Sequence, residues 1–590
     1  MRKNHILSAL AMAAVTFGLT ACADTDAQYT IPDVDAPQLV SSTPTEGANK
    51  VKRGDITVNL KFDKRIFFAS NEAEKITVTG GTLSKALVYG QDSVLSVIIN
   101  CPEREQNVSV TVPAGLVANG QGKTYNKDIN VSFQTVGLDK TPVMATTIEA
   151  KKLYNFLLEN VDTKTISGMM ANVAWNQECA DKVNEWTGKY PAINGFDYGH
   201  MPASKAGANW INYKDITPVK NWSDNHGIVQ MMWHWNVPKD EPQAGKGIEM
   251  LSDWSANLQL TNDAVKAAIG NAQVGDKLVA TISDVADGAQ GSIKNSSWTG
   301  FTDEAGTSWE YFDISGDQYS MTLDATTLAD MKNNGFILSG HDYTLTGVYI
   351  VPANKDLAQG TQLYKPTATL DPNKDYAFYV KSDGNPDGTT FDPSNALKEG
   401  TWENEVWKND MATLKEYLTL LKNANIPVLW RPFHEASGKW FWWGAKDAAT
   451  FKTLWIEMFN ELKEAGLDNL IWVWTSCGKD DDWYPGDAYV DIVARDLYGE
   501  KAETCASEFA TLSSTYGNKI VTLGECGYST STKKQIATLS EQNEKGAKWS
   551  WFMVWYNDES SQTYHSTQEW WQNAMSQPNI ITRDQVPSMK

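Results

Sequence analysis

The sequence predicts a multidomain fold in which a (β/α)8 TIM barrel is preceded by one all-β sandwich and interrupted by a second. Three observations lead to this prediction. After residue 136, apolar strand patterns alternate with amphipathic helical patterns, as in barrels built from βα units. Short alternating strand patterns occupy residues 37–136, and similar patterns return in residues 241–354. The length of 590 residues leaves room for several domains.

Residues 1–22 match the pattern of a bacterial lipoprotein signal peptide. Arg2 and Lys3 precede an apolar run over residues 6–19, and Thr20-Ala21-Cys22 follows it. The run is too short for a membrane-spanning helix, so we expect cleavage before Cys22 and lipidation of its thiol. An ordinary cleaved signal with an incidental cysteine is the alternative.

The expected lipid anchor sets the location of the mature protein. Residues 23–36 are polar and rich in aspartate, which predicts a flexible tether. We therefore expect attachment to a bacterial membrane through the lipid alone, at the cell-surface or periplasmic face of the outer membrane. The formal net charge of −21 argues against nucleic acid as a partner. This charge suits an exported protein, expected to be a monomer, that faces a neutral substrate.

The first folded part is predicted to span residues 37–136. Its polar and apolar residues alternate in short runs, such as residues 56–62 and 108–112, and turn residues separate the runs. This pattern predicts an antiparallel sandwich and resembles bacterial immunoglobulin-like modules. The stretch lacks clustered carboxylates and histidines, so a spacer is favoured over a binding module.

The barrel is predicted to be formed by residues 145–240 and 355–585. Amphipathic helical patterns, such as residues 411–423 and 450–465, separate apolar strand patterns. Eight such strands close a barrel. The predicted strands are residues 165–170, 192–197, 227–234, 426–432, 470–474, 490–496, 520–525 and 549–555.

The interval between the third and fourth barrel strands is far longer than one barrel helix needs, which indicates an insertion over residues 241–354. Its strand patterns resemble the jelly-roll sandwiches of carbohydrate-binding modules. Several of its aromatic residues could stack on sugars, with the alternative that they fill the core of the sandwich. They are Trp254, Trp298, Phe301, Trp309 and Tyr311.

The cysteines beyond Cys22 do not suggest a disulfide framework or a metal site. Their number is odd and they are widely scattered, without the spacing of metal ligands. They are Cys101, Cys179, Cys477, Cys505 and Cys526. We expect most of them to be buried, and we expect neither a metal nor a cofactor.

Polar and aromatic residues mark the ends of the predicted barrel strands. In a parallel barrel, side chains at the carboxyl ends of the strands share one mouth, where catalytic groups are found. The residues at these positions are Asp197, His234, His434, Glu435, Asp496, Tyr498, Glu525 and Trp555. Glu435 and Glu525 end the fourth and seventh strands. Hydrolysis of a glycosidic bond needs two such carboxyls, one protonated and one ionised.

The most informative stretch is residues 429–444. It follows a buried-strand pattern and combines Arg431, His434 and Glu435 with tryptophans that begin at Trp440. Tryptophan-rich runs can simply fill a core, but a core would not place three unpaired polar residues among them. A carboxylic acid beside several indoles indicates a sugar-binding site.

Four motifs occur in an order that resembles glycoside hydrolase family 26, whose members are mostly β-mannanases. They lie at residues 431–444, 483–487, 496–498 and 524–525. The resemblance covers the barrel from about residue 147 to residue 573, without the insertion.

The resemblance implies a retaining double displacement. Glu435 would be the acid/base and Glu525 the nucleophile. Further roles are implied for His234 and Trp440 as sugar contacts at the cleavage site, Tyr498 as a hydrogen-bond partner of the nucleophile, and Trp555 as a sugar platform. We expect Asp197, His434 and Asp496 also to line the substrate site.

Elementary electrostatics agrees with these implied roles. Glu435 beside Trp440 and His434 is expected to be partly desolvated, which raises its pKa. Glu525 beside the Tyr498 phenol is expected to stay ionised. The remaining histidines carry no such context and are expected to be ordinary surface or turn residues. They are His200, His226, His341 and His565.

The sequence therefore predicts an endo-acting β-1,4-mannanase for mannan, glucomannan or galactomannan. Two alternatives remain. The same scaffold could serve a β-1,3-xylanase or a mixed-linkage β-glucanase. A non-catalytic glycan-binding lipoprotein would keep the aromatics but lose a carboxylate, and both glutamates are present.

Overall fold

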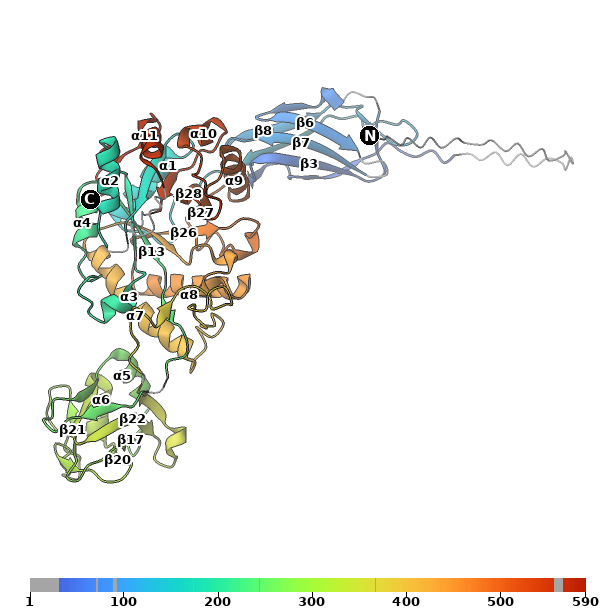
Figure 1. Cartoon of the computed structure of the whole chain (residues 1–590). Helices are drawn as coiled ribbons and strands as arrows, with labels where there is room; N and C mark the ends of the chain where they lie inside the picture. The colour runs from blue at the N-terminus through green and yellow to red at the C-terminus, as the bar shows by residue number, and fades with distance from the viewer. Residues whose placement is uncertain are drawn as a thin grey trace, which may run out of the picture. The chain divides into compact units, whose positions relative to one another are not determined.

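The computed structural model describes residues 31–69, 73–88, 93–172, 175–243, 245–366, 368–555 and 566–590 (Figure 1). Cys22 and His565 lie outside these residues. The chain divides into two compact units, Met1–Val136 and Gly137–Lys590. Within the described residues, no helix is both long and apolar enough to cross a membrane.

Two four-stranded sheets build the first unit. One has the order β1-β3-β7-β6 and the other β2-β10-β8-β5. All of their ladders are antiparallel except β2–β10, which is parallel. The strands are Leu39–Thr43 (β1), Ala48–Val51 (β2), Gly54–Phe62 (β3), Thr77–Thr79 (β5), Thr82–Val88 (β6), Val94–Cys101 (β7), Asn107–Val112 (β8) and Ile129–Thr135 (β10). The spacer role and the immunoglobulin-like assignment stay predictions.

Alternation along β3 explains how this unit forms a core. Val58 and Leu60 are fully buried on one face, while Thr57 and Lys61 point outward. On β7, Leu95 and Val97 are buried as well. Strands of period two thus place one apolar face of each sheet into a shared core.

The second unit contains the predicted barrel. Its parallel strands follow the order β12-β13-β25-β26-β27-β28-β29-β11, and pairing of β11 with β12 closes the ring. The eight strands are Thr165–Met170 (β11), Ile193–Asp197 (β12), Ile228–Trp233 (β13), Val428–Pro432 (β25), Leu470–Ser476 (β26), Ile492–Tyr498 (β27), Ile520–Gly527 (β28) and Trp551–Val554 (β29). Each matches one predicted strand, so the barrel prediction is confirmed.

Helices flank the barrel strands. They include Ile148–Asn160 (α1), Glu178–Thr187 (α2), Thr217–Asp224 (α4), Trp402–Asn423 (α7), Ala448–Glu464 (α8), Ala502–Thr515 (α9), Leu539–Glu544 (α10) and Gln568–Ser576 (α11). Helix α7 begins nine residues before the predicted 411 because Thr401 caps it, accepting a hydrogen bond from the Asn404 amide. Asp447 caps α8 in the same way, through the Thr450 amide.

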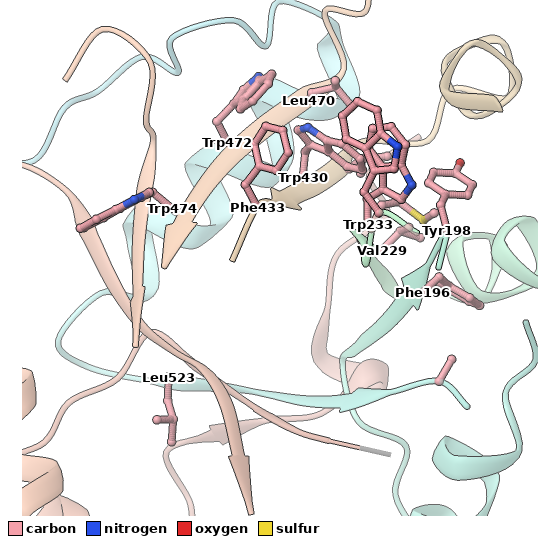
Figure 2. Close-up of a cluster of buried hydrophobic side chains, with 14 of the residues drawn as sticks. Phe196, Tyr198, Val229, Trp233, Trp430, Phe433, Leu470, Trp472, Trp474 and Leu523 are labelled. Carbon is pink, nitrogen blue, oxygen red and sulfur yellow. The ribbon is translucent and has the colours of Figure 1, made fainter. Parts of the chain in front are cut away.

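Tryptophans fill much of the space between the barrel and its helices. Figure 2 shows Trp233, Trp430, Trp472 and Trp474 in one cluster of buried side chains. The Trp233 ring stacks on that of Trp235, with centroids 3.8 Å apart. Large aromatic contacts of this kind stabilise the strands whose ends carry the site residues.

The insertion folds into two further sheets with a core of its own. One sheet has the order β15-β22-β17-β20, with β23 paired to β22, and the other has the order β16-β21-β18-β19. The strands are Ile248–Met250 (β15), Asn257–Leu260 (β16), Lys277–Ser283 (β17), Gln290–Asn295 (β18), Phe312–Asp313 (β19), Gln318–Thr322 (β20), Phe336–His341 (β21), Tyr343–Val351 (β22) and Thr361–Tyr364 (β23). The sheet thus continues beyond the predicted boundary at residue 354.

Candidate active site

The predicted residues meet at the carboxyl ends of the barrel strands. Asp197 ends β12, and Glu525 lies two residues before the end of β28. Tyr498 ends β27, and Asp496 lies two residues before it. His234 follows β13 directly. His434 and Glu435 follow β25, and Trp555 follows β29. The topology therefore brings together residues from six different strands.

Arg431 on β25 organises two of the carboxylates. It is fully buried, and its Nη1 donates to Glu525 Oε1 at 2.6 Å. Its Nη2 donates to Asp496 Oδ2, and its Nε to Thr475 Oγ1 at 2.9 Å. A buried arginine is stable only when its donors are satisfied by such partners. The sequence pattern predicted an unpaired Arg431 without a specific role, and the pairing with Asp496 and Glu525 corrects this prediction. A charged residue within an apolar strand is the signal that could have marked it.

The Glu525 carboxylate is held at both oxygens. Tyr498 donates its hydroxyl hydrogen to Glu525 Oε2 at 2.7 Å, and Arg431 holds Oε1. Burial nevertheless raises the pKa of Glu525 to about 7, and the charge of Asp496 adds to this effect. The expectation that the phenol alone keeps Glu525 ionised was too simple. Arg431 and Tyr498 together oppose a large cost of burial.

Three carboxyl groups, those of Glu435, Asp496 and Glu525, lie near a single positive charge, that of Arg431. One oxygen each of Glu435, Asp496 and Glu525 lies within 4.8 Å of the others. Full ionisation would leave two uncompensated negative charges in a buried site, which is costly. Burial, followed by the charge of Glu525, raises the pKa of Glu435 to about 7. Burial also raises the pKa of Asp496, to about 8. The site therefore retains a proton near neutral pH.

Geometry favours Glu435 and Asp496 as the pair that holds this proton. Their carboxyls influence each other's pKa, their oxygens lie within 4.8 Å of each other, and Asp496 Oδ1 has no hydrogen-bond partner among the described residues. Two ionised carboxylates cannot bond, because neither offers a hydrogen. Glu525 already has two donors, so it is the best stabilised as an anion. This division of roles is the one that an acid and a nucleophile require.

The turn that carries Glu435 is unusual. Phe433, Glu435 and Lys439 all have positive φ angles, of 47°, 53° and 63°. Residues other than glycine rarely have positive φ angles, and those that do cluster at functional sites. A Cβ atom on Gly438 would lie 2.1 Å from the Trp440 ring, so glycine is needed there. Trp440 then donates its indole hydrogen to Glu435 Oε2 at 3.1 Å.

The tryptophan run divides between site and core. Trp440 is 43% exposed, whereas Trp442 and Trp443 are buried. The two buried indoles donate to backbone oxygens of Trp235 and His434. Of the several indoles expected beside the carboxylic acid, only Trp440 is exposed at the site, while Trp442 and Trp443 pack behind the turn.

Asp197 orients His234. One carboxylate oxygen accepts from the His234 backbone amide at 2.9 Å, and the other lies against His234 Nδ1. Burial works to raise the pKa of Asp197, but the charge and hydrogen bonds of His234 outweigh it and lower the pKa. His234 and Trp555 line a small cavity of about 90 Å³, together with His200. His200, expected to be an ordinary residue, thus belongs to the wall of this cavity.

His434 lies behind the site surface. Only 1% of it is exposed, and its ring centroid is 4.4 Å from that of His234. Burial, with the charges of His234 and Arg431, lowers its pKa well below the usual value. The ring is therefore neutral. Its Nδ1 has no partner among the described residues.

The segment after the insertion adds a residue that sequence reasoning missed. Tyr379 is 46% exposed, and its ring stacks on Phe441 with centroids 5.2 Å apart. A backbone bond from Val380 N to Trp440 O, at 2.9 Å, joins this segment to the catalytic turn. Burial and then the charges of Glu435 and Glu525 raise the Tyr379 pKa. No sequence signal marked it, because the insertion separates it from every barrel motif.

Comparison with known proteins gives one family. The family described as Glycosyl hydrolase family 26 matches residues 143–332 and 378–585. A mannan endo-1,4-beta-mannosidase B of Piromyces sp is 32% identical over 216 residues, which cover 36% of this chain and 35% of the relative. A mannan endo-1,4-beta-mannosidase of Thermothelomyces thermophilus is 35% identical over 196 residues, covering 31% and 36%. The chain thus spans about a third of the length of these curated relatives.

One solved structure is also similar to this chain in sequence. The GH26 domain of an endo-beta-mannanase/endo-beta-glucanase from Prevotella bryantii is 31% identical and has a TM-score of 0.48. The match covers 75% of this chain and 97% of that domain.

Proposed function

The chain belongs to glycosyl hydrolase family 26, and on that premise we propose that it is a retaining endo-β-1,4-mannanase acting on mannan, glucomannan or galactomannan. One observation carries the proposal. Oxygens of Glu435 and Glu525 approach within 4.8 Å at the barrel mouth. Retaining glycosidases hold their two carboxyls about 5–5.5 Å apart, whereas inverting enzymes need roughly 6.5–9.5 Å to admit a water.

In the first step, Glu525 attacks the anomeric carbon while Glu435 gives its proton to the departing glycosidic oxygen. The C–O bond to the leaving sugar breaks, and an ester bond to Glu525 forms. In the second step, Glu435 takes a proton from water, the water oxygen bonds to the anomeric carbon, and the ester bond breaks. Glu525 leaves as a carboxylate, and Glu435 is again protonated.

The electrostatics of the site supports this change of role. The negative charge of Glu525 contributes to the raised pKa of Glu435. When Glu525 becomes an ester, that charge disappears while Arg431 stays positive. The pKa of Glu435 therefore falls at the moment when Glu435 must act as a base.

Reducing-sugar release tests the substrate class. We expect release from glucomannan and galactomannan, and little from β-1,3-xylan or from lichenan, which is a mixed-linkage β-glucan. A preference for either of the last two would favour the corresponding alternative activity. No release from any polymer, with retained binding, would favour the non-catalytic glycan-binding alternative.

Replacing Tyr498 by phenylalanine should shift the pH dependence of the reaction. The substitution removes the hydroxyl that donates to Glu525 and lowers its pKa. Loss of this donor raises the pKa of Glu525, so the nucleophile becomes protonated at higher pH. The acidic limb of the kcat/KM profile should therefore move to higher pH in Tyr498→Phe. An unchanged acidic limb would show that Tyr498 does not stabilise the ionised nucleophile.

We further propose that the protein is a monomer anchored to the outer membrane through a lipid on Cys22. The basic, apolar and small-residue pattern of residues 1–22 supports the anchor. Cys22→Ala should move the protein from the detergent phase to the aqueous phase in a partition assay, with unchanged kcat/KM on a soluble oligosaccharide. Continued partition into detergent would contradict the anchor, and size-exclusion chromatography with light scattering checks the monomer.

We also propose that the insertion is a carbohydrate-binding module. Its separate core and its surface aromatic residues support this assignment. Such a module would hold polysaccharide near the barrel and lower the concentration needed for attack.

A further inference from the structure

One face of the insertion combines aromatic and polar side chains without belonging to its core. In the sheet β16-β21-β18-β19, Ile293 and Leu338 point into the core of the sandwich. Because neighbouring strand residues alternate, Ser292 and Lys294 lie on the opposite face of the sheet. Ser339 and His341 share that face, since they pair with Ser292 and Gln290 across the ladder.

The structure divides the five aromatic residues that were candidates for sugar stacking. Phe301 is buried, and Trp309 packs against the core of the sandwich. Tyr311 is 59% exposed and Trp298 is 46% exposed. Trp254 is partly exposed. Three of the five therefore remain available to a ligand.

These three rings form one cluster. Trp254 and Tyr311 meet edge to face, with centroids 5.5 Å apart. The Lys294 Nζ atom lies 5.8 Å from the Trp298 ring and 5.9 Å from the Tyr311 ring. The ring centroids of His341 and Trp254 are 4.9 Å apart. The cluster, defined by these five residues, is contributed by segments that are distant in sequence.

Two of the ring-bearing residues, Trp254 and Trp298, have backbone conformations that are unfavourable for bulky residues. Trp254 has a φ of 60° and Trp298 a φ of 65°. Bulky residues rarely occupy this region of backbone conformation. Such conformations persist only where the surrounding structure maintains them, and they cluster at functional sites. The Asn295 side chain maintains the turn at Trp298, accepting from the Ser297 and Thr299 amides.

Polar groups of the same face are fixed or lack partners. Asp342 binds His341 Nδ1 at 2.6 Å and accepts from Ser252 at 2.6 Å, which orients the imidazole. The Ser292 and Ser339 hydroxyls are buried and have no partner among the described residues.

The charges around the cluster select a neutral ligand. Acidic residues flank its members along the chain. Asp253 precedes Trp254, Glu310 precedes Tyr311, and Asp342 follows His341. Lys294 is the one cation among the five clustered residues, so an acidic polysaccharide would meet net repulsion. Flat aromatic rings suit the apolar C–H faces of β-linked hexoses, whose hydroxyls lie at the ring edges.

We propose that Trp254, Trp298 and Tyr311, with Lys294 and His341, form a binding site for a neutral β-1,4-linked hexose polysaccharide. The site is separate from Glu435 and Glu525 and works without bond cleavage. The proposal rests on the proposed function only in the choice of polymer, which is the substrate of the barrel. According to this proposal, one face of the sheet β16-β21-β18-β19 binds the polysaccharide and keeps it near the barrel.

The test uses the full chain with Glu525→Ala, so that polymer stays intact. Affinity electrophoresis in gels containing glucomannan or galactomannan measures binding for Trp254→Ala, Tyr311→Ala and the double variant. All variants share the same barrel, so differences between them report the insertion. We expect binding at least about tenfold weaker in the double variant, since aromatic anchors dominate such surfaces. Tyr311 is the most exposed of the three rings, so Tyr311→Ala is the variant least able to disturb folding, and it checks that a loss of binding does not come from misfolding.

Tyr349→Ala is the matched control, because Tyr349 lies on β22 in the other sheet of the same sandwich. We expect its binding to equal that of the parent. Unchanged binding in the double variant, or an equal loss in Tyr349→Ala, would overturn the proposed site. Tighter binding to an acidic polysaccharide than to glucomannan would overturn its ligand class. Failure of the wild type to hydrolyse mannans would instead refute the proposed activity, and these binding comparisons would still be readable.

Discussion

Glu525→Ala is expected to abolish turnover on every substrate, including aryl glycosides with good leaving groups. Glu525 must form a bond to the anomeric carbon, and among the described residues no other carboxylate is held there by both Arg431 and Tyr498. A good leaving group removes the need for an acid but not the need for a nucleophile. The measurement is release of the aryl alcohol by Glu525→Ala and by the wild type.

Azide provides the control for this variant. It is small enough to enter the space left by the carboxylate and can attack the anomeric carbon directly. The expected product is a glycosyl azide of inverted configuration. Substantial turnover by Glu525→Ala without azide would show that another group is the nucleophile. Circular dichroism should confirm the fold, because Arg431 loses one of its two carboxylate partners in this variant.

Glu435→Ala should show a different pattern. Glu435 only moves protons, so the first step should survive for an activated aryl glycoside, while the second step slows and the glycosyl-enzyme accumulates. A burst of aryl alcohol followed by slow turnover is the expected time course. On natural mannan, which has a poor leaving group, the loss should be ~10²–10⁴-fold, the usual contribution of general acid/base catalysis.

Azide also distinguishes the two variants. In Glu435→Ala it attacks the glycosyl-enzyme and needs no base, so it should restore steady-state turnover and yield a glycosyl azide of retained configuration. Trp440→Phe keeps the carboxylic acid and removes its indole partner, which makes it a suitable control. It should lose activity without gaining any response to azide. Equal responses of both variants would remove Glu435 from the acid/base role.

The barrel and its catalytic pair were predictable because their signals are local. Each barrel strand is a short apolar run, and the two glutamates directly follow or end such runs. Once eight strands are arranged in a ring, the positions of Glu435 and Glu525 at one end of the barrel follow from the topology. Nothing about tertiary contacts is needed for that step.

Other features depend on contacts between distant segments. Trp440 and Trp442 are the same residue type two positions apart, yet one is exposed and the other buried, because the turn around Gly438 folds only the first over Glu435. Tyr379 reaches the site across an insertion of more than a hundred residues. The raised pKa of Glu525 depends first on its own burial and then on the charge of Asp496. Sequence patterns carry no information about such distances.

The stereochemistry of the first product tests the central claim most directly. Proton nuclear magnetic resonance can follow the anomeric signals while the wild type cleaves a β-1,4-mannooligosaccharide. The two carboxyls lie too close together to admit a water between Glu525 and the sugar, so a covalent intermediate is expected. The β-anomer should appear first and convert slowly to the equilibrium mixture by mutarotation. Initial appearance of the α-anomer would mean inversion, and would contradict the roles given to both Glu435 and Glu525.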